Sequence, residues 1–386
     1  MHTVYFDYNA TTPLDEGVRD TMLPYLSEIF GNPSSVHRVG RQARGLLDDA
    51  RARAAEVLCC KPSEVIFTSG GTESTNQAIF GVARLLKEKG KHIVTSAIEH
   101  HAVLHCCDYL EKKENFEITR LAVDREGKVP VESLEEAIRR DTILVSIMAA
   151  NNEIGTIQPI LELGAVCRKS GVLFHCDAVQ WFGKEPFESI EQFKADLVSI
   201  CAHKFHGPKG AGALFVKSPL LPDPILFGGG HENERRAGTE NLAGIIGFVE
   251  ALERFVRKPV FAKEKLLPLT ERLISAIDKI EGTQFVGSRS NRLINTVSLL
   301  VRGSDSIALL AGLDMEGICA SSGSACAAGS LAPSHVISAL GAEKDLANSL
   351  VRFSLGREST MEEVAQVERI LPEVIQRATK GKRVGR

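Results

Sequence analysis

Short runs of β-branched and apolar residues alternate along the chain with longer amphipathic segments, and this alternation constrains the fold more than any other feature. The runs are almost continuously apolar, which is typical of strands buried on both faces of a parallel sheet. The expected strands are 64–68, 91–95, 117–122, 143–148, 172–176, 196–201 and 213–216. The expected helices between them are 73–88, 102–110, 134–139 and 160–169. The pattern therefore predicts an α/β fold with helices on both faces of the sheet.

The rhythm of the sequence changes after a Gly-rich stretch at 228–239. Helices are expected at 242–255, 263–280, 306–313, 334–340 and 361–377, and strands only at 293–300 and 351–355. We therefore predict a large α/β domain over 16–255 and a smaller α+β domain formed by 1–15 together with 256–386.

Composition narrows the class of protein. The chain has 386 residues, of which 44% are hydrophobic, so it can bury a large core. Its 46 basic and 49 acidic side chains give a net charge of −3, which argues against a broad nucleic-acid-binding face. The apolar runs are too short for a membrane span, and no signal or transit peptide is visible. The nine cysteines form no CxxC pair, which indicates reduced thiols and a cytoplasmic protein.

The segment Thr68–Glu73 (TSGGTE) follows an expected strand and opens an expected helix. Glycines in such a turn let backbone N–H groups approach a phosphate, and the helix dipole favours its negative charge. The segment lacks the spacing of a P-loop or of a dinucleotide-binding site, so a single phosphate fits it better than a nucleotide. An ordinary tight turn is the alternative interpretation.

Asp177 and Lys204 each follow the end of an expected buried strand. Taken separately, Asp177 could be a helix cap and Lys204 a solvated loop residue. Together they match pyridoxal phosphate (PLP) chemistry, in which a lysine of lowered pKa forms a Schiff base with the aldehyde and an aspartate pairs with the pyridinium nitrogen. With a phosphate turn upstream, the sequence accounts for three parts of one cofactor.

Residues 321–330 (SSGSACAAGS) are all small and offer little to bury, so we expect an exposed, mobile loop. Cys326 lies in this loop, although an unpaired cysteine is usually buried. An exposed thiol is a liability unless its reactivity is used, so Cys326 is a candidate nucleophile. An incidental small residue is the alternative. A metal site at His101 and His105 is disfavoured because no further ligands complete it.

Several motifs, in order along nearly the whole chain, resemble the group I cysteine desulfurases of the NifS/IscS type, which are class V aminotransferase-fold PLP enzymes. The motifs are DYNATTP at 7–13, FGNPSS at 30–35, NNEIG at 151–155, HK at 203–204, SSGSAC at 321–326 and RFSLGR at 352–357. The resemblance implies PLP fold type I, with a mostly parallel seven-stranded sheet in the large domain and the loop 321–330 in the small one.

The resemblance also implies roles for individual residues. Lys204 would hold PLP and move the substrate α-proton, His100 would stack on the ring and assist, and Cys326 would be the nucleophile. The other implied cofactor contacts are Asp177 at the ring nitrogen; Gln180 and Asn152 near the ring hydroxyl; and Gly71, Thr72, Cys201, His203 and the second subunit's Thr239 near the phosphate. The implied substrate contacts are Arg352, Asn152 and Asn32.

The implied reaction converts L-cysteine into L-alanine and leaves a persulfide on Cys326. The enzyme would be a homodimer that delivers sulfur to an iron–sulfur scaffold protein or to tRNA thiolation. It would have no dedicated metal site, although Cys326 could transiently ligate a cluster with a scaffold partner. The competing functions are a selenocysteine lyase, another class V PLP-dependent lyase or transaminase, and a non-catalytic sulfur carrier.

The sequence departs from the family pattern at Cys201, where serine is usual and its hydroxyl contacts the phosphate. A thiol is a weaker hydrogen-bond donor, so we predict looser retention of PLP. The chain also ends soon after its last expected helix, without the longer tail that IscS-type members use to dock their scaffold. The resemblance therefore leaves the sulfur acceptor open.

Overall fold

The computed structural model describes residues 3–323 and 333–381, and its centre is a seven-stranded sheet. Its strands, in spatial order, are β2 (Val65–Thr68), β8 (Gly212–Val216), β7 (Leu197–Cys201), β6 (Leu173–Asp177), β5 (Thr142–Met148), β3 (His92–Ser96) and β4 (Glu117–Leu121). From β7 to β4 neighbouring strands run parallel, whereas β8 is antiparallel to both β2 and β7. The predicted α/β class and mostly parallel sheet are confirmed.

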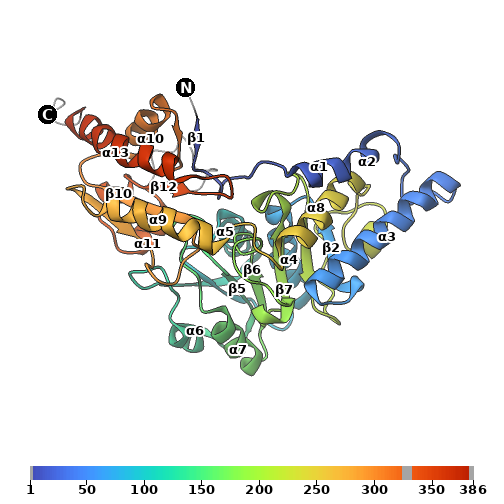
Figure 1. The fold of residues 1–386 in the computed structure, drawn as a ribbon. Coiled ribbons are helices and arrows are strands. Elements are labelled where there is room, and N and C mark those ends of the chain that lie inside the picture. Colours follow the sequence, from blue (N-terminus) through green and yellow to red (C-terminus); the bar gives the residue numbers. More distant parts are fainter. Residues whose placement is uncertain (1–2, 324–332, 382–386) are drawn as a thin grey trace.

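Helices cover both faces of this sheet, as Figure 1 shows. Neighbouring residues of one strand divide between the two faces: Val65 and Phe67 pack into one apolar cluster and Ile66 into another. The helices of this half are α1 (Glu16–Met22), α2 (Pro24–Ser27), α3 (Arg38–Leu58), α4 (Gly71–Leu86), α5 (His101–Glu114), α6 (Val131–Ala137), α7 (Ile160–Ser170) and α8 (Leu242–Phe255). Because both faces are covered, the continuously apolar strands are explained.

The remaining elements form two further apolar clusters around two small sheets. The antiparallel sheet has the order β12 (Val351–Ser354), β10 (Thr296–Val301) and β9 (Thr283–Val286), and β1 (Val4–Tyr5) pairs in parallel with β11 (Ile318–Cys319). The helices here are α9 (Lys263–Ile277), α10 (Ser306–Met315), α11 (His335–Ala339), α12 (Lys344–Ala347) and α13 (Met361–Gly381). The first strand of the chain thus lies with its last third (Figure 1).

The sequence analysis did not include α3, which is 21 residues long, nor the short elements α1, α2, α12, β1, β9 and β11. Among the described residues, no helix is both long and apolar enough to cross a membrane. The domain boundary at 255/256 stays a prediction.

Candidate active site

A cavity of about 220 Å³ lies where β6 and β7 end and α4 begins. Its lining comes from distant parts of the sequence, because parallel strands bring their carboxyl ends to one edge of the sheet. The lining residues are Asn9, Ala10, Gly71, Thr72, His100, Ala102, Met148, Ala150, Asn152, Asp177, Val179, Gln180, Cys201, His203, Lys204 and Arg352. Ten of the residues that the sequence analysis named for the site therefore lie around one cavity.

Lys204 ends a short 3₁₀ turn, Ala202–Lys204, that directly follows β7. Its Nζ donates hydrogen bonds to the carbonyl oxygens of Asn9 (2.7 Å) and Ala10 (2.8 Å). Burial is the main cause that lowers the pKa of Lys204 to about 8. A larger fraction of this amine is therefore neutral and nucleophilic at physiological pH than in an exposed lysine.

Asp177 is the last residue of β6, and its side chain faces the same cavity. One carboxylate oxygen accepts a hydrogen bond from the Val179 N–H at 3.0 Å. Burial raises the pKa of Asp177 to about 6, although that hydrogen bond and the nearby Lys204 act in the opposite direction. A buried carboxylate with so little compensation is well suited to pair with a cationic ring nitrogen.

The turn between β2 and α4 forms the end of the cavity that suits a phosphate group. Gly70 has φ +147° and precedes Gly71 and Thr72, which open the 16-residue helix α4. A Cβ on Gly71 would lie 2.6 Å from Val179 Cγ2, so a side chain would crowd the turn. Cys201 lies beside these glycines, and burial raises the pKa of its thiol. The helix N-terminus and bare backbone suit a phosphate group.

His100 caps the N-terminus of α5, where its Nδ1 accepts a hydrogen bond from the Ala102 N–H at 3.1 Å. Burial, aided by the charge of Lys204, lowers the pKa of His100 to about 4. The ring is thus neutral at pH 7, and since Nδ1 is an acceptor, the proton resides on Nε2. His100 can face a flat ring without bringing a charge.

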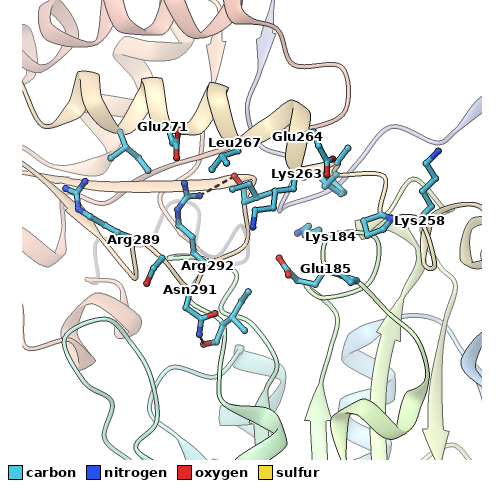
Figure 2. A pocket seen from close by; sticks show the side chains of 18 of the residues that line it. Lys184, Glu185, Lys258, Lys263, Glu264, Leu267, Glu271, Arg289, Asn291 and Arg292 are labelled. Carbon is cyan, nitrogen blue, oxygen red and sulfur yellow. Dashed lines mark hydrogen bonds between the residues drawn. The ribbon is translucent and has the colours of Figure 1, made fainter.

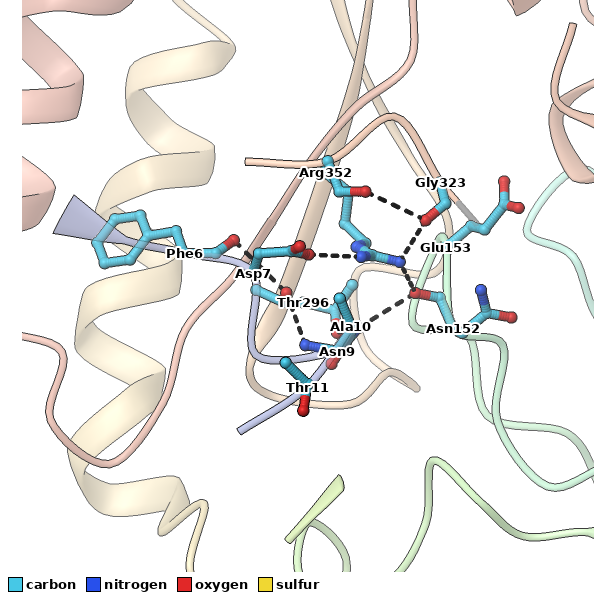
Figure 3. A network of polar contacts seen from close by, with 12 residues as sticks. Phe6, Asp7, Asn9, Ala10, Thr11, Asn152, Glu153, Thr296, Gly323 and Arg352 are labelled. Carbon is cyan, nitrogen blue, oxygen red and sulfur yellow. Dashed lines mark hydrogen bonds and ion pairs between the residues drawn. The ribbon is translucent and has the colours of Figure 1, made fainter. Parts of the chain in front are cut away.

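Arg352 lies on β12, yet it lines the cavity, and the residue is 1% exposed. Figure 3 shows it between Asp7, to whose carboxylate it donates at 2.7 Å, and the carbonyl oxygens of Asn152 and Gly323, at 2.8 and 2.7 Å. Its buried Nε has no hydrogen-bond partner among the described residues. An unused donor beside the cavity fits a ligand carboxylate.

Two of the residues named from the sequence lie away from this cavity, and a third is outside the described residues. Asn32 and Thr239 are exposed and do not line this cavity. Thr239 instead lines a separate hollow beside the β2–α4 turn. Cys326 lies outside the described residues, as do the other residues of 324–332.

The sequence analysis gave no role to Asn9 or Glu99. Asn9 is 1% exposed and connects the two halves, because its side chain bonds Thr296 while its carbonyl oxygen accepts from Lys204. Glu99 is fully buried behind the cavity, where its Oε1 accepts from Ser96 Oγ and the Met148 N–H. Burial raises the pKa of Glu99 to about 8. In the sequence, Glu99 could have been noticed as an acidic residue directly before His100, shortly after an expected strand.

Comparison with known proteins identifies the family. The aminotransferase class-V family matches residues 4–367. A protein named cysteine desulfurase IscS, from Dictyoglomus turgidum, is 47% identical over 97% of this chain and 95% of its own length. The chain belongs to the cysteine desulfurases of the class-V family.

Solved structures of this family agree with the fold. A NifS-like protein is 37% identical, with a TM-score of 0.90 over 97% of this chain and 100% of its own. SspA in complex with cysteine is 35% identical, with a TM-score of 0.81 over 93% of this chain and 100% of its own. The fold is PLP fold type I, as predicted.

Class-V cysteine desulfurases depend on PLP, so the chain is a PLP-dependent enzyme. The residues of the cavity fit this cofactor. They supply a desolvated amine in Lys204, an uncompensated carboxylate in Asp177 and a glycine turn at a helix N-terminus. These three groups match the aldehyde, the ring nitrogen and the phosphate of PLP.

Proposed function

We propose that this enzyme converts L-cysteine into L-alanine and transfers the sulfur to Cys326, from which an acceptor protein takes it. The observation that carries the proposal is the single cavity that unites Lys204, Asp177 and Arg352. The cysteine seen in the related SspA complex supports the choice of substrate. PLP bound on Lys204 would supply an electron sink for the charge left when the substrate α-proton departs.

The side chains of the cavity then have distinct proposed roles. Lys204, with its lowered pKa, takes the α-proton and returns it. Neutral His100 lies against the cofactor ring, and Asp177 holds the ring nitrogen in its protonated form. Gln180 and Asn152 would lie near the ring hydroxyl, and Gly71, Thr72, Cys201 and His203 would hold the phosphate.

Arg352 would bind the substrate carboxylate, with Asn152 nearby and Asn32 as a further proposed contact. Its Nε–H and the second hydrogen of the Nη that contacts Asp7 are the donors left over by the contacts described above. Because Asp7 fixes the guanidinium plane, the substrate carboxylate meets a preorganised donor pair.

Sulfur transfer falls to Cys326. Its thiolate forms a bond to the sulfur of the bound cysteine as the substrate carbon–sulfur bond breaks, and the electron pair of that bond passes to the carbon. Protonation of this carbon gives alanine, and the enzyme keeps a persulfide. We propose that an iron–sulfur scaffold or a tRNA-thiolation protein then takes the sulfur in the cytoplasm, with cluster ligation by Cys326 as a transient event.

We also propose a homodimer in which Thr239 completes the phosphate site of the second subunit. Thr239 is exposed and outside the cavity of its own chain. Large apolar side chains are exposed in 23–36 and again in 221–227, the second of which lies shortly before Thr239. They are Leu23, Leu26, Phe30, Val36, Leu221, Leu226 and Phe227. Such exposure is typical of a surface that a partner covers.

The decisive experiment is to incubate the PLP-loaded enzyme with L-cysteine, trap persulfides with an alkylating reagent and locate them by mass spectrometry. We expect the extra sulfur on Cys326 and none on Cys201. The Cys326→Ala variant should form the PLP-dependent absorption normally but release no sulfur from cysteine. Sulfur release at the parental rate by this variant would instead indicate an elimination reaction of the selenocysteine lyase type.

A further inference from the structure

Lys184 is a second buried lysine, 3% exposed, that does not line the cavity. Its Nζ donates to Asn9 Oδ1 at 2.8 Å and to Gln180 Oε1, and lies 5.4 Å from the centre of the Phe261 ring. Among the described residues, no carboxylate oxygen lies within 4 Å of this nitrogen. A lysine buried without an ion-pair partner is rare, because the desolvation of its charge is expensive.

Both acceptors of Lys184 belong to the wall of the cavity. Gln180 donates from its Nε2 to the Asn9 carbonyl oxygen at 3.1 Å, and Lys204 donates to that same oxygen. Lys184 also lines a groove of about 1030 Å³ under α9 (Figure 2), while its Nζ is directed at the wall of the cavity. Lys184 therefore lies behind the cavity wall, and the side chain of Gln180 lies between it and the cavity.

This contact decides which end of the Gln180 amide faces the cavity. An amide has a donor end and an acceptor end of nearly equal size, so a neighbouring group has to choose between the two orientations. Lys184 offers N–H bonds and takes the oxygen, and one Nε2 hydrogen goes to Asn9. The second Nε2 hydrogen remains for the cavity.

The neutral form of Lys184 can make the same two contacts. Burial lowers the pKa of Lys184 well below its usual value, which favours the neutral amine. A neutral amine has two N–H bonds, and the two amide oxygens of Asn9 and Gln180 accept both of them.

We propose that Lys184 is a positioning residue that holds Gln180 as a hydrogen-bond donor to the ring oxygen of the bound cofactor. The inference rests on the proposed function, because it requires PLP on Lys204. A hydrogen bond donated to this oxygen stabilises its negative charge and weakens its hold on the proton of the lysine–cofactor linkage. Loss of the donor should therefore raise the pH at which that proton leaves.

The test is a pH titration of the visible absorption of the PLP-loaded enzyme, in the absence of substrate. We expect Lys184→Met and Gln180→Met each to move the midpoint upward by about 1 pH unit, the size of one hydrogen bond to a charged group. The double variant should move it no further than either single variant, since both act through one contact. His100, Asp177, His203 and Arg352 face the same cavity and are unchanged throughout.

Lys263→Met is the matched control, because Lys263 is an exposed lysine that lines the same groove. Its midpoint should equal that of the parent. If Lys184→Met does not fold, Lys184→Gln keeps a two-hydrogen donor, and its midpoint should lie between those of the parent and Gln180→Met. A Lys184 variant that titrates like the parent, or a double variant in which the two shifts add, overturns the proposal. A parent enzyme without visible absorption would instead overturn the PLP site on Lys204.

Discussion

Of the two hollows beside Lys184, the smaller one contains the candidate reactive groups. The cavity around Lys204 has a volume of about 220 Å³, and the groove under α9 about 1030 Å³. In the cavity, burial shifts the pKa values of Lys204, Asp177 and His100 in the direction that favours the uncharged form of each side chain. In the groove, most charged side chains are exposed, although Lys184 and Arg292 are buried, and Arg289 has an ordinary surface partner in Asp278 at 2.7 Å.

The volume of a hollow therefore does not mark the reactive site. A charged group that stays in water keeps its ordinary chemistry, whereas one that has lost its water without gaining a counter-charge is ready to react with a ligand. Substitutions in the cavity should therefore have large effects, and substitutions in the groove small ones.

The largest expected effect is on Lys204. Lys204→Ala should lose the visible absorption of lysine-bound PLP and lower turnover of cysteine by at least about 10³-fold, because it removes both the attachment point and the base. Absorption spectra after addition of PLP, together with alanine production, measure this. Borohydride treatment of the parent should leave reduced PLP on Lys204, and label on a different lysine would contradict the assignment.

The next effect concerns Glu99, whose raised pKa makes it protonated in the folded protein. Its pKa is about 8 when folded against an ordinary 4.5, so folding takes up a proton between these values. The free energy of unfolding should therefore fall as pH rises through this window.

In Glu99→Gln this contribution disappears, and the dependence between pH 5.5 and 7.5 should flatten by about 1.4 kcal/mol per pH unit, the value for one proton. Urea unfolding at several pH values, followed by circular dichroism with excess PLP, measures it. Parallel profiles for parent and variant would show that Glu99 is charged in the folded state, and the contrast with the groove would weaken.

A smaller effect is expected at Cys201. Cys201→Ser replaces a weak donor by a hydroxyl that can bond the phosphate, so PLP should dissociate about threefold to tenfold more slowly. Dilution into apo-acceptor enzyme, followed by the decay of absorbance, gives the rate. Cys167→Ser, at a buried cysteine in α7 that does not line the cavity, controls for a general effect of the substitution. Equal rates in parent and Cys201→Ser would remove the predicted cost of the thiol.

The smallest effects belong to the groove. Arg289→Ala removes an exposed ion pair whose side chains are 58% and 43% accessible, and should change stability by no more than about 0.5 kcal/mol. Turnover of cysteine should stay within about twofold of the parent, as for surface substitutions in general. Thermal unfolding and steady-state kinetics test both. A tenfold loss of turnover would mean that the larger hollow participates in the reaction.

The pattern of apolar runs predicted the seven strands of the large sheet with small errors at their ends, because burial on both faces makes these runs continuous. The same pattern cannot distinguish strand direction, so the antiparallel course of β8 was not predictable. Helix α3 was missed because small alanines form much of its buried stripe, although Ala43, Leu47, Ala50 and Ala54 do recur at helical spacing.

For the site, Lys204 and Asp177 were predictable because each stands where a buried strand ends. Asn9 and Lys184 were not, since their importance comes from contacts with residues far away in sequence. No local pattern reports that an asparagine near the start of the chain meets lysines that follow strands of the large sheet. Asn32 and Thr239 stay predictions, because neither lines the cavity of its own chain.

The contacts of Asn9 also set the order in which the protein can be assembled during synthesis. Asn9 bonds Lys204, Thr296 and Ser354, the last of which is 345 residues further along the chain. The segment around Asn9 leaves the ribosome first but waits for its final partner until β12 has been made. Closing a loop of this length is slow compared with forming local structure. The wall of the cavity is thus one of the last parts of the fold to be completed, and tight cofactor capture is an event of the finished chain.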